Sequence, residues 1–372
     1  MKRILSLDGG GIRGVFTIAI LERIEALLRE HYKDSKPGLV LADYFDFIGG
    51  TSTGAIIAAL LSKGLSVRAI RESYEQLGPI VFRRKPFWQS WRSFYGSEDF
   101  ADLLRELFRE KEEKGDGEWE YMTLGSKRLL TDLMIVVRNG STGSMWPLTN
   151  NPVAKYNQKK SPEEETNLDI PLWQLVRASA AAPVFFPSEM VTLKRRDGKE
   201  QTFEFIDGGV SAYNNPSVAM FLHATLPVYH MNYPTGVDQL FLCSVGTGVL
   251  PLRFQPGELG KINIIGGALR TLGAMMESVT EEQDKLCRVL GDCIHGEHLD
   301  REALDLKGHG MKNFGYVRYQ HEFTKEEIEA SRRRTKSLRP LDIDDLAGLE
   351  DLLKIGRKYA EETVSPEHFP MD

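Results

Sequence analysis

Residues 4–14, with the sequence ILSLDGGGIRG, place a short apolar run directly before a glycine-rich turn. Apolar side chains then recur with helical spacing over residues 15–28. The stretch therefore predicts a strand, a tight turn and a helix. Backbone N–H groups at such a turn point toward negative charge in front of the helix. Because glycine runs are common in loops, this turn alone does not indicate a function, and other motifs of the chain are needed to interpret it.

A second strand-to-helix turn is expected at residues 50–54, with the sequence GTSTG. It lies between the mainly apolar residues 44–48 and the apolar residues 55–61, and its glycines stand two positions either side of Ser52. This spacing is typical of a nucleophile elbow, in which glycines leave room for a sharp turn and let the following helix pack closely. The two turns together indicate an anion cradle beside a nucleophile, and hence acyl transfer through an acyl-serine.

Length and composition bound the class of protein. The chain has 372 residues, of which 41% are hydrophobic, enough for one α/β core with insertions. Its net charge of −6 argues against binding nucleic-acid polymers, which needs a basic face. The three cysteines lack the spacing of a disulfide framework. Without a signal peptide or an apolar run of about 18 residues, we expect a cytoplasmic protein that contacts membranes only peripherally.

Short apolar runs alternate with helical patterns through the first two thirds of the chain, which is typical of a mainly parallel sheet with helices on both faces. We expect a single domain over residues 1–372, with a catalytic core at 1–250 and a mainly helical extension at 251–372 packed on that core. Strands are expected at 3–7, 45–48, 129–137, 203–206, 239–245 and 316–319, with a hairpin around 197–198, and helices at 12–30, 53–61, 67–77, 98–110, 171–181, 266–290 and 343–361.

Ser52 needs a base, and the identity of this base decides the class of enzyme. A triad hydrolase would use a late histidine, for which His309 is the best candidate, although no clear strand precedes it. Asp207 is the stronger candidate, because it ends a β-rich run and is followed by two glycines. An aspartate is a weak base at its usual pKa of about 3.9, so it would act through a short hydrogen bond in a partly dry site.

Three segments in this order, residues 8–14, 50–54 and 207–209, resemble the ordered motifs of patatin-like phospholipases. The likeness extends over roughly residues 3–250. It implies a three-layer α/β/α fold with a mainly parallel central sheet and helices added by the C-terminal extension. Supporting segments lie at residues 176–183, 214–216 and 244–248.

The resemblance also implies how the site works. Ser52 attacks an ester carbonyl of a membrane phospholipid while Asp207 accepts its proton, a reaction that needs no metal and no other cofactor. The glycine loop forms an oxyanion hole, and the residues expected to build it are Gly9, Gly10, Gly11 and Arg13. Asp8 is expected to be structural, with its carboxylate accepting N–H groups of the loop.

Other interpretations stay open. Ser52 could merely cap a helix, and Asp207 could be an ordinary turn residue. An acyltransferase or thioesterase would use the same dyad with another acceptor, and a storage or binding protein of this fold would need no turnover. The length and layout are also similar to those of bacterial patatin-like effectors of antiphage systems. That similarity implies activation by a cyclic dinucleotide, without a nucleotide motif to place it. The sequence leaves homo-oligomer formation open.

Residues 79–95 combine six aromatic side chains with four cations and no acid. Aromatic residues beside Lys and Arg suit an anionic headgroup layer, so this segment predicts a lid or a loop that docks transiently on the inner membrane surface. In the alternative interpretation the aromatic side chains cover the core while the cations stay in water.

Overall fold

The structure is a computed structural model that describes residues 1–81, 98–113, 119–251, 264–296, 312–337 and 339–371. Most of the aromatic segment 79–95 and His309 lie outside the described residues. Within them, no helix is both long enough and apolar enough to cross a bilayer.

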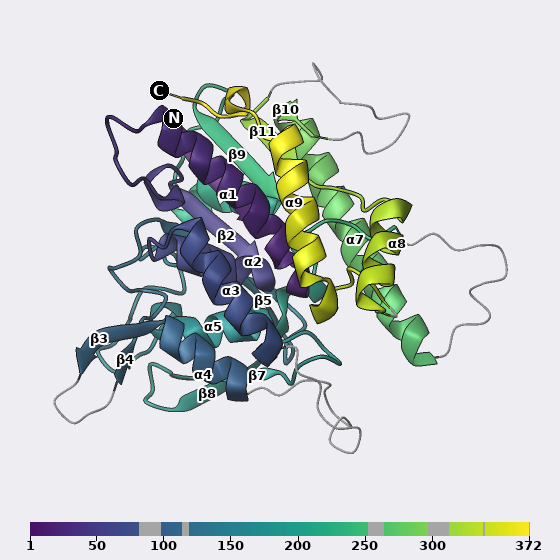
Figure 1. Ribbon diagram of the computed structural model, residues 1–372. Helices are drawn as coiled ribbons and strands as arrows, with labels where there is room; N and C mark the ends of the chain where they lie inside the picture. Colours follow the sequence, from purple (N-terminus) through teal and green to yellow (C-terminus); the bar gives the residue numbers. More distant parts are fainter. Residues whose placement is uncertain (82–97, 114–118, 252–263, 297–311, 338, 372) are drawn as a thin grey trace.

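A central sheet of nine strands organises the described part of the chain (Figure 1). The strand order is β10-β11-β9-β1-β2-β5-β8-β7, and β6 also pairs with β5. All pairs from β10 to β5 are parallel, whereas β6, β7 and β8 are antiparallel to their neighbours. The strands are β1 (Lys2–Leu7), β2 (Phe47–Thr51), β5 (Asp132–Asn139), β6 (Met145–Thr149), β7 (Glu189–Lys194), β8 (Glu200–Asp207), β9 (Leu240–Val245), β10 (Asp292–His295) and β11 (Gly315–Tyr319).

Helices cover both faces of this sheet, so the predicted mainly parallel sheet and three-layer α/β/α fold are confirmed. In Figure 1, α1 and α9 lie side by side across one face. The helices are α1 (Gly14–His31), α2 (Thr53–Ser62), α3 (Val67–Val81), α4 (Glu98–Leu107), α5 (Leu172–Ser179), α6 (Ser217–Thr225), α7 (Ile264–Leu290), α8 (Lys325–Thr335) and α9 (Leu349–Thr363).

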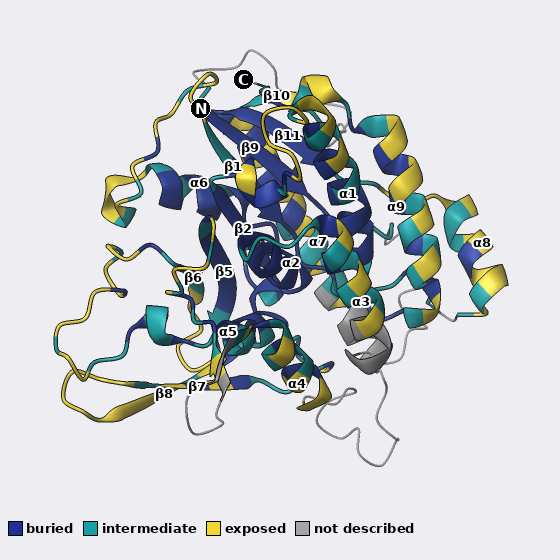
Figure 2. Cartoon of the chain, turned by 60° about the vertical axis from the view of Figure 1, so that its left-hand side comes forward, coloured by how far each residue is buried: buried dark blue, intermediate teal, exposed yellow. Residues whose placement is uncertain are grey.

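Alternation along the strands divides the hydrophobic core into two layers. Leu5 and Ile48 pack with the helices from α1 to α5 and α9, while their neighbours Ile4 and Phe47 face α6 and the end of α7. Successive side chains of a strand point to opposite faces, so a strand covered on both sides must be apolar throughout. Figure 2 shows the result, with the central strands and α2 almost entirely buried.

The C-terminal extension contributes strands as well as the expected helices. β11 pairs with β9 and β10 pairs with β11, so this part of the chain extends the central sheet in addition to covering it. The strand at 316–319 was expected from its apolar side chains. β10 has only four residues, too few for a reliable pattern. A second departure is the helix expected at 98–110, which ends at Leu107 because β3 (Arg109–Glu113) pairs there with β4 (Trp119–Tyr121).

A buried ion pair joins this extension to the first turn of the fold. Asp8 follows β1, and its carboxylate accepts hydrogen bonds of 3.0 and 2.6 Å from the guanidinium of Arg318 on β11. The guanidinium also donates to Ser244 on β9, at 2.7 Å. This ion pair favours the structural role expected for Asp8, but among the described residues its carboxylate binds a distant arginine and not the N–H groups of the glycine loop.

Asp8→Asn should destabilise the protein strongly, because it leaves the buried guanidinium of Arg318 without a carboxylate. We expect the free energy of unfolding, measured by urea denaturation at neutral pH, to fall by about 3–5 kcal/mol. The double variant Asp8→Asn/Arg318→Met should lose clearly less than the sum of the two single variants, since it buries no uncompensated charge. Strictly additive losses would contradict the coupling.

Candidate active site

The position of the site follows from strand pairing along one edge of β5. β2 runs parallel to β5 and ends where Thr51 pairs with Val136. β8 runs antiparallel along β5 and ends where Asp207 pairs with Val137. β6 occupies the other edge, pairing with the same two residues of β5. The carboxyl ends of β2 and β8 therefore meet head to head, which brings Ser52 and Asp207 together from 155 positions apart.

Ser52 occupies the sharp turn between β2 and α2. Its backbone has φ 54° and ψ −121°, a conformation that costs energy for a residue with a side chain. The flanking glycines make the turn possible: a Cβ on Gly50 would overlap the backbone of Gly54, and a Cβ on Gly54 would overlap the carbonyl oxygen of Leu7. These close contacts give a physical reason for the Gly-x-Ser-x-Gly spacing.

The hydroxyl of Ser52 donates a hydrogen bond of 2.7 Å to Oδ2 of Asp207. The other carboxylate oxygen, Oδ1, accepts the N–H of Gly209 at 2.6 Å. Ser52 makes no side-chain cap to α2, whereas Asp207 does cap the short turn after β8. This geometry is the one expected of a nucleophile hydrogen-bonded to a base, as the sequence predicts for these two residues.

Burial determines the acidity of this base. Ser52 is only 7% exposed to solvent, and Asp207 is only 3% exposed. Burial raises the pKa of Asp207 to about 6, although its hydrogen bonds from Ser52 and Gly209 favour the ionised form. Asp207 is thus a stronger base than a solvated aspartate and is still ionised at neutral pH.

Only some residues of the glycine loop line the cavity. The N–H of Gly9 bonds to the carbonyl oxygen of Asn214 at 3.0 Å, so in this conformation it faces away from an oxyanion. Gly10 and Gly11 line the cavity beside Ser52, whereas Gly9 and Arg13 do not. The oxyanion-hole role of these four residues stays a prediction, with Gly10 and Gly11 the better placed.

Arg13 does not line the pocket and lies near acidic groups of the C-terminal extension. Burial lowers its pKa, and the charges of Asp342 and Glu277 offset part of this shift. Its Nε is buried with no hydrogen-bond partner among the described residues. This position favours a supporting role over direct contact with an oxyanion.

Ser179 is a site residue that sequence reasoning did not single out. Its hydroxyl accepts the backbone N–H of Ser52 at 2.9 Å and donates to the carbonyl oxygen of Val136 at 2.6 Å. It thereby ties the elbow to β5, the strand that aligns β2 and β8. Ser179 belongs to the segment 176–183, but a single serine at a helix end carries no signal of its own.

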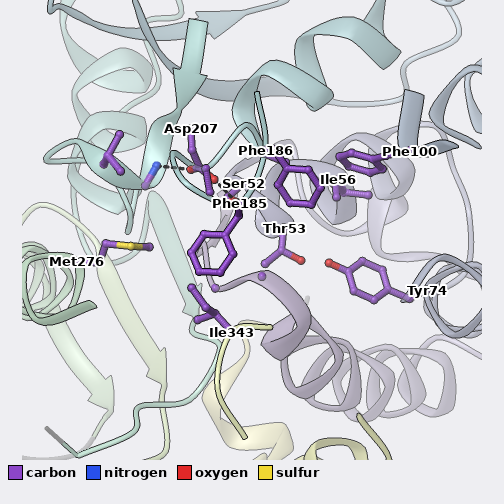
Figure 3. Close-up of a pocket in the computed structure, with 16 residues that line it drawn as sticks. Ser52, Thr53, Ile56, Tyr74, Phe100, Phe185, Phe186, Asp207, Met276 and Ile343 are labelled. Atoms are coloured by element: carbon purple, nitrogen blue, oxygen red, sulfur yellow. Dashed lines mark hydrogen bonds between the residues drawn. The ribbon is translucent and has the colours of Figure 1, made fainter. Parts of the chain in front are cut away.

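An apolar pocket of about 850 Å³, its open mouth included, surrounds the Ser52–Asp207 pair. Figure 3 shows Ser52 and Asp207 among aromatic and aliphatic side chains, with Phe100 and Tyr74 on one side in this view and Met276 on the other. Such a pocket suits a hydrocarbon chain whose ester group reaches the serine. Its large apolar side chains are Ile56, Phe100, Phe185, Phe186, Val210, Met276 and Ile343.

The described residues contain no group of three or more Cys, His, Asp or Glu side chains arranged to hold a metal ion. Cys287 and Cys293 are both buried, and burial raises the pKa of the Cys287 thiol. Buried thiols of this kind are ordinary core residues.

Known proteins resemble this chain over more than half of its length. The family model described as "Patatin-like phospholipase" matches residues 5–220. Patatin-T5 of Solanum tuberosum is 32% identical over 259 residues, and Patatin group J-1 of the same plant is 32% identical over 260. Each alignment covers 67% of this chain and 61% of the relative, so the chain spans less than two thirds of those proteins.

Among solved structures, VipD from Legionella pneumophila aligns with 95% of this chain and 67% of its own, at 13% identity and a TM-score of 0.34. The family match covers more than half of the chain and includes both Ser52 and Asp207. The chain therefore belongs to the patatin-like phospholipase family.

Proposed function

We propose that this protein is a lipid acyl hydrolase that cleaves carboxylic ester bonds of membrane phospholipids through an acyl-serine intermediate. One observation carries the proposal: the 2.7 Å hydrogen bond from Ser52 to the buried Asp207 inside an apolar pocket. Membership of the patatin-like phospholipase family supports the same reaction class.

The proposed reaction has two steps. Ser52 Oγ attacks the ester carbonyl carbon as Asp207 takes the hydroxyl proton, and the carbonyl oxygen becomes an oxyanion that the N–H groups of Gly10 and Gly11 stabilise. The carbon–oxygen bond to the lysolipid then breaks, and Asp207 returns the proton to the leaving alkoxide. In the second step Asp207 deprotonates a water, which attacks the acyl-serine. The carbon–oxygen bond to Ser52 then breaks, Asp207 returns the proton to Ser52 Oγ, and the fatty acid is released.

An acyltransferase or a thioesterase would share the first step and differ in the acceptor or the leaving group. Products from mixed phospholipids, identified by mass with and without a lysolipid acceptor, separate these functions. Free fatty acid as the main product supports the hydrolase, and a newly acylated acceptor supports the transferase.

Removing either member of the dyad should abolish hydrolysis. We expect Ser52→Ala and Asp207→Asn to lower kcat on phospholipid vesicles on the order of 10⁴–10⁶-fold, as in other serine hydrolases. Ser278→Ala, on an exposed part of α7, is the matched control and should leave kcat unchanged. Fatty-acid release that survives Ser52→Ala would contradict the mechanism, and inhibition by EDTA would indicate a metal requirement.

The reaction should also depend on the protonation of Asp207. Because protonated Asp207 cannot accept the serine proton, we expect kcat/KM to rise about tenfold per pH unit below the pKa of about 6 and to level off above it. A soluble p-nitrophenyl ester avoids titrating the lipid itself. Glu277 has a pKa raised to about 7, mainly by burial, so Glu277→Gln is the control. If the rise of kcat/KM with pH disappears in Glu277→Gln, the rise reports the titration of Glu277 and not of Asp207.

We further propose activation by a cyclic dinucleotide in antiphage defence, with the active protein acting at the inner membrane surface. What supports this regulation is the likeness of length and layout noted above. The test compares fatty-acid release from anionic vesicles with and without a panel of cyclic dinucleotides, and measures the oligomeric state in the same samples. Full activity without any nucleotide, or inactivity with every member of the panel, would contradict it.

A further inference from the structure

A short segment of the C-terminal extension, residues 339–345, contacts the glycine loop directly. The carbonyl oxygen of Ile343 accepts the backbone N–H of Ile12 at 2.8 Å. Gly11 has φ +61°, and a Cβ at this position would overlap that same carbonyl oxygen. The loop therefore takes its shape against Ile343, a residue 332 positions away from Gly11 in the chain. We call residues 339–345 the brace.

The brace is itself held in one conformation. The guanidinium of Arg339 donates hydrogen bonds of 2.7 and 2.6 Å to the two carboxylate oxygens of Asp344, and it lies 3.4 Å from the carboxylate of Asp342. Leu341 has φ 62° yet is fully buried, and its N–H bonds to Asp345 at 2.8 Å. A buried leucine persists in this strained backbone region only where its surroundings enforce it.

The extension also forms one wall of the pocket. The side chain of Ile343 lines the cavity, as does Met276 of α7, whose Cε lies 3.0 Å from where a Cβ on Gly209 would stand. Figure 3 shows Ile343 and Met276 near Phe185, on the opposite side of the view from Tyr74. Both residues follow position 220, where the family match ends. This part of the wall therefore lies outside the residues that the family model matches.

We propose that the brace completes the active site: through the Ile343 carbonyl it positions the glycine loop, and through the Ile343 side chain it limits the acyl group that fits beside Ser52. The inference rests on the proposed acyl hydrolase function. It adds that residues of the extension set the position of the glycine loop and the selectivity for the acyl group. Oxyanion donors act only when they lie at hydrogen-bond distance from the developing charge, so a loop that moves loses transition-state stabilisation before it loses substrate binding.

The first test loosens the brace without touching the pocket. Arg339→Met removes its ion pairs, and we expect kcat to fall on the order of 10–100-fold with KM little changed, as for other small misplacements of catalytic groups. End-point labelling of Ser52 by a fluorophosphonate counts the folded active sites, so kcat is expressed per labelled site. Arg339→Lys, which keeps a cation, should recover part of the loss.

Arg333→Met is the matched control, because it removes an exposed arginine of α8 whose carboxylate partner is Glu329. It should leave kcat per labelled site unchanged. The positioning role is overturned if Arg339→Met retains wild-type kcat per labelled site, or if Arg333→Met loses as much.

The second test changes the wall alone. Ile343→Ala keeps the backbone carbonyl but widens the pocket, and Ile343→Phe narrows it. We expect the ratio of kcat/KM for p-nitrophenyl palmitate to that for the butyrate to rise several-fold in Ile343→Ala and to fall in Ile343→Phe. Val153→Ala, at an exposed site, serves as the control. Equal ratios in all four proteins would overturn the selectivity role, and this arm carries the test if Arg339→Met does not fold.

These outcomes are distinct from failure of the proposed function. If the wild-type protein shows no ester hydrolysis that depends on Ser52, the function itself is wrong. If hydrolysis depends on Ser52 and Asp207 but responds to neither Arg339 nor Ile343, only the brace is wrong.

Discussion

The site depends on how two strands, β2 and β8, pair along the same edge of β5. β2 and β8 share that edge from opposite directions, and their last residues pair with the consecutive residues Val136 and Val137. The Ser52–Asp207 hydrogen bond is a consequence of this register. A slip of one residue in either pairing would turn the affected side chains to the other face of the sheet and separate the pair. Ser179, bonded both to Ser52 and to the carbonyl of Val136, adds a direct tie at the same point.

Two buried aspartates show how the fold gives the same residue type two different tasks. Asp8 is buried against the guanidinium of Arg318, which compensates its charge and joins β1 to β11. Asp207 is buried with a hydroxyl and one backbone N–H, so burial dominates and its pKa rises to about 6. Burial raises the pKa of Asp8 as well, but there the charge and hydrogen bonds of Arg318 oppose the rise and engage both carboxylate oxygens. Among the described residues Asp207 has only neutral donors, and its Oδ2 accepts the hydroxyl of Ser52. The difference fits a structural role for Asp8 and a proton-accepting role for Asp207.

The C-terminal extension contacts the site at several points, although it lies far from Ser52 in the sequence. Arg318 compensates Asp8, the carbonyl of Ile343 bonds to Ile12, and Met276 packs beside Gly209. These contacts reach the glycine loop, the pocket wall and the turn after the base. The extension thus contacts the site, and in Figure 3 its residues Met276 and Ile343 lie across the pocket from Tyr74 of α3 and Phe100 of α4.

The amino-acid sequence determined the local parts of this protein. Strand-to-helix turns at Gly11 and Ser52, most of the strands of the first 250 residues, and Ser52 and Asp207 as candidates all follow from short-range patterns, because glycine spacing and side-chain alternation are local properties. Only the tertiary structure decided which distant residues meet: Asp8 with Arg318, Ser52 with Ser179, and Gly11 with Ile343. It also showed that the N–H of Gly9 donates a hydrogen bond to the carbonyl oxygen of Asn214. These contacts depend on strand register and on burial, which no local pattern encodes.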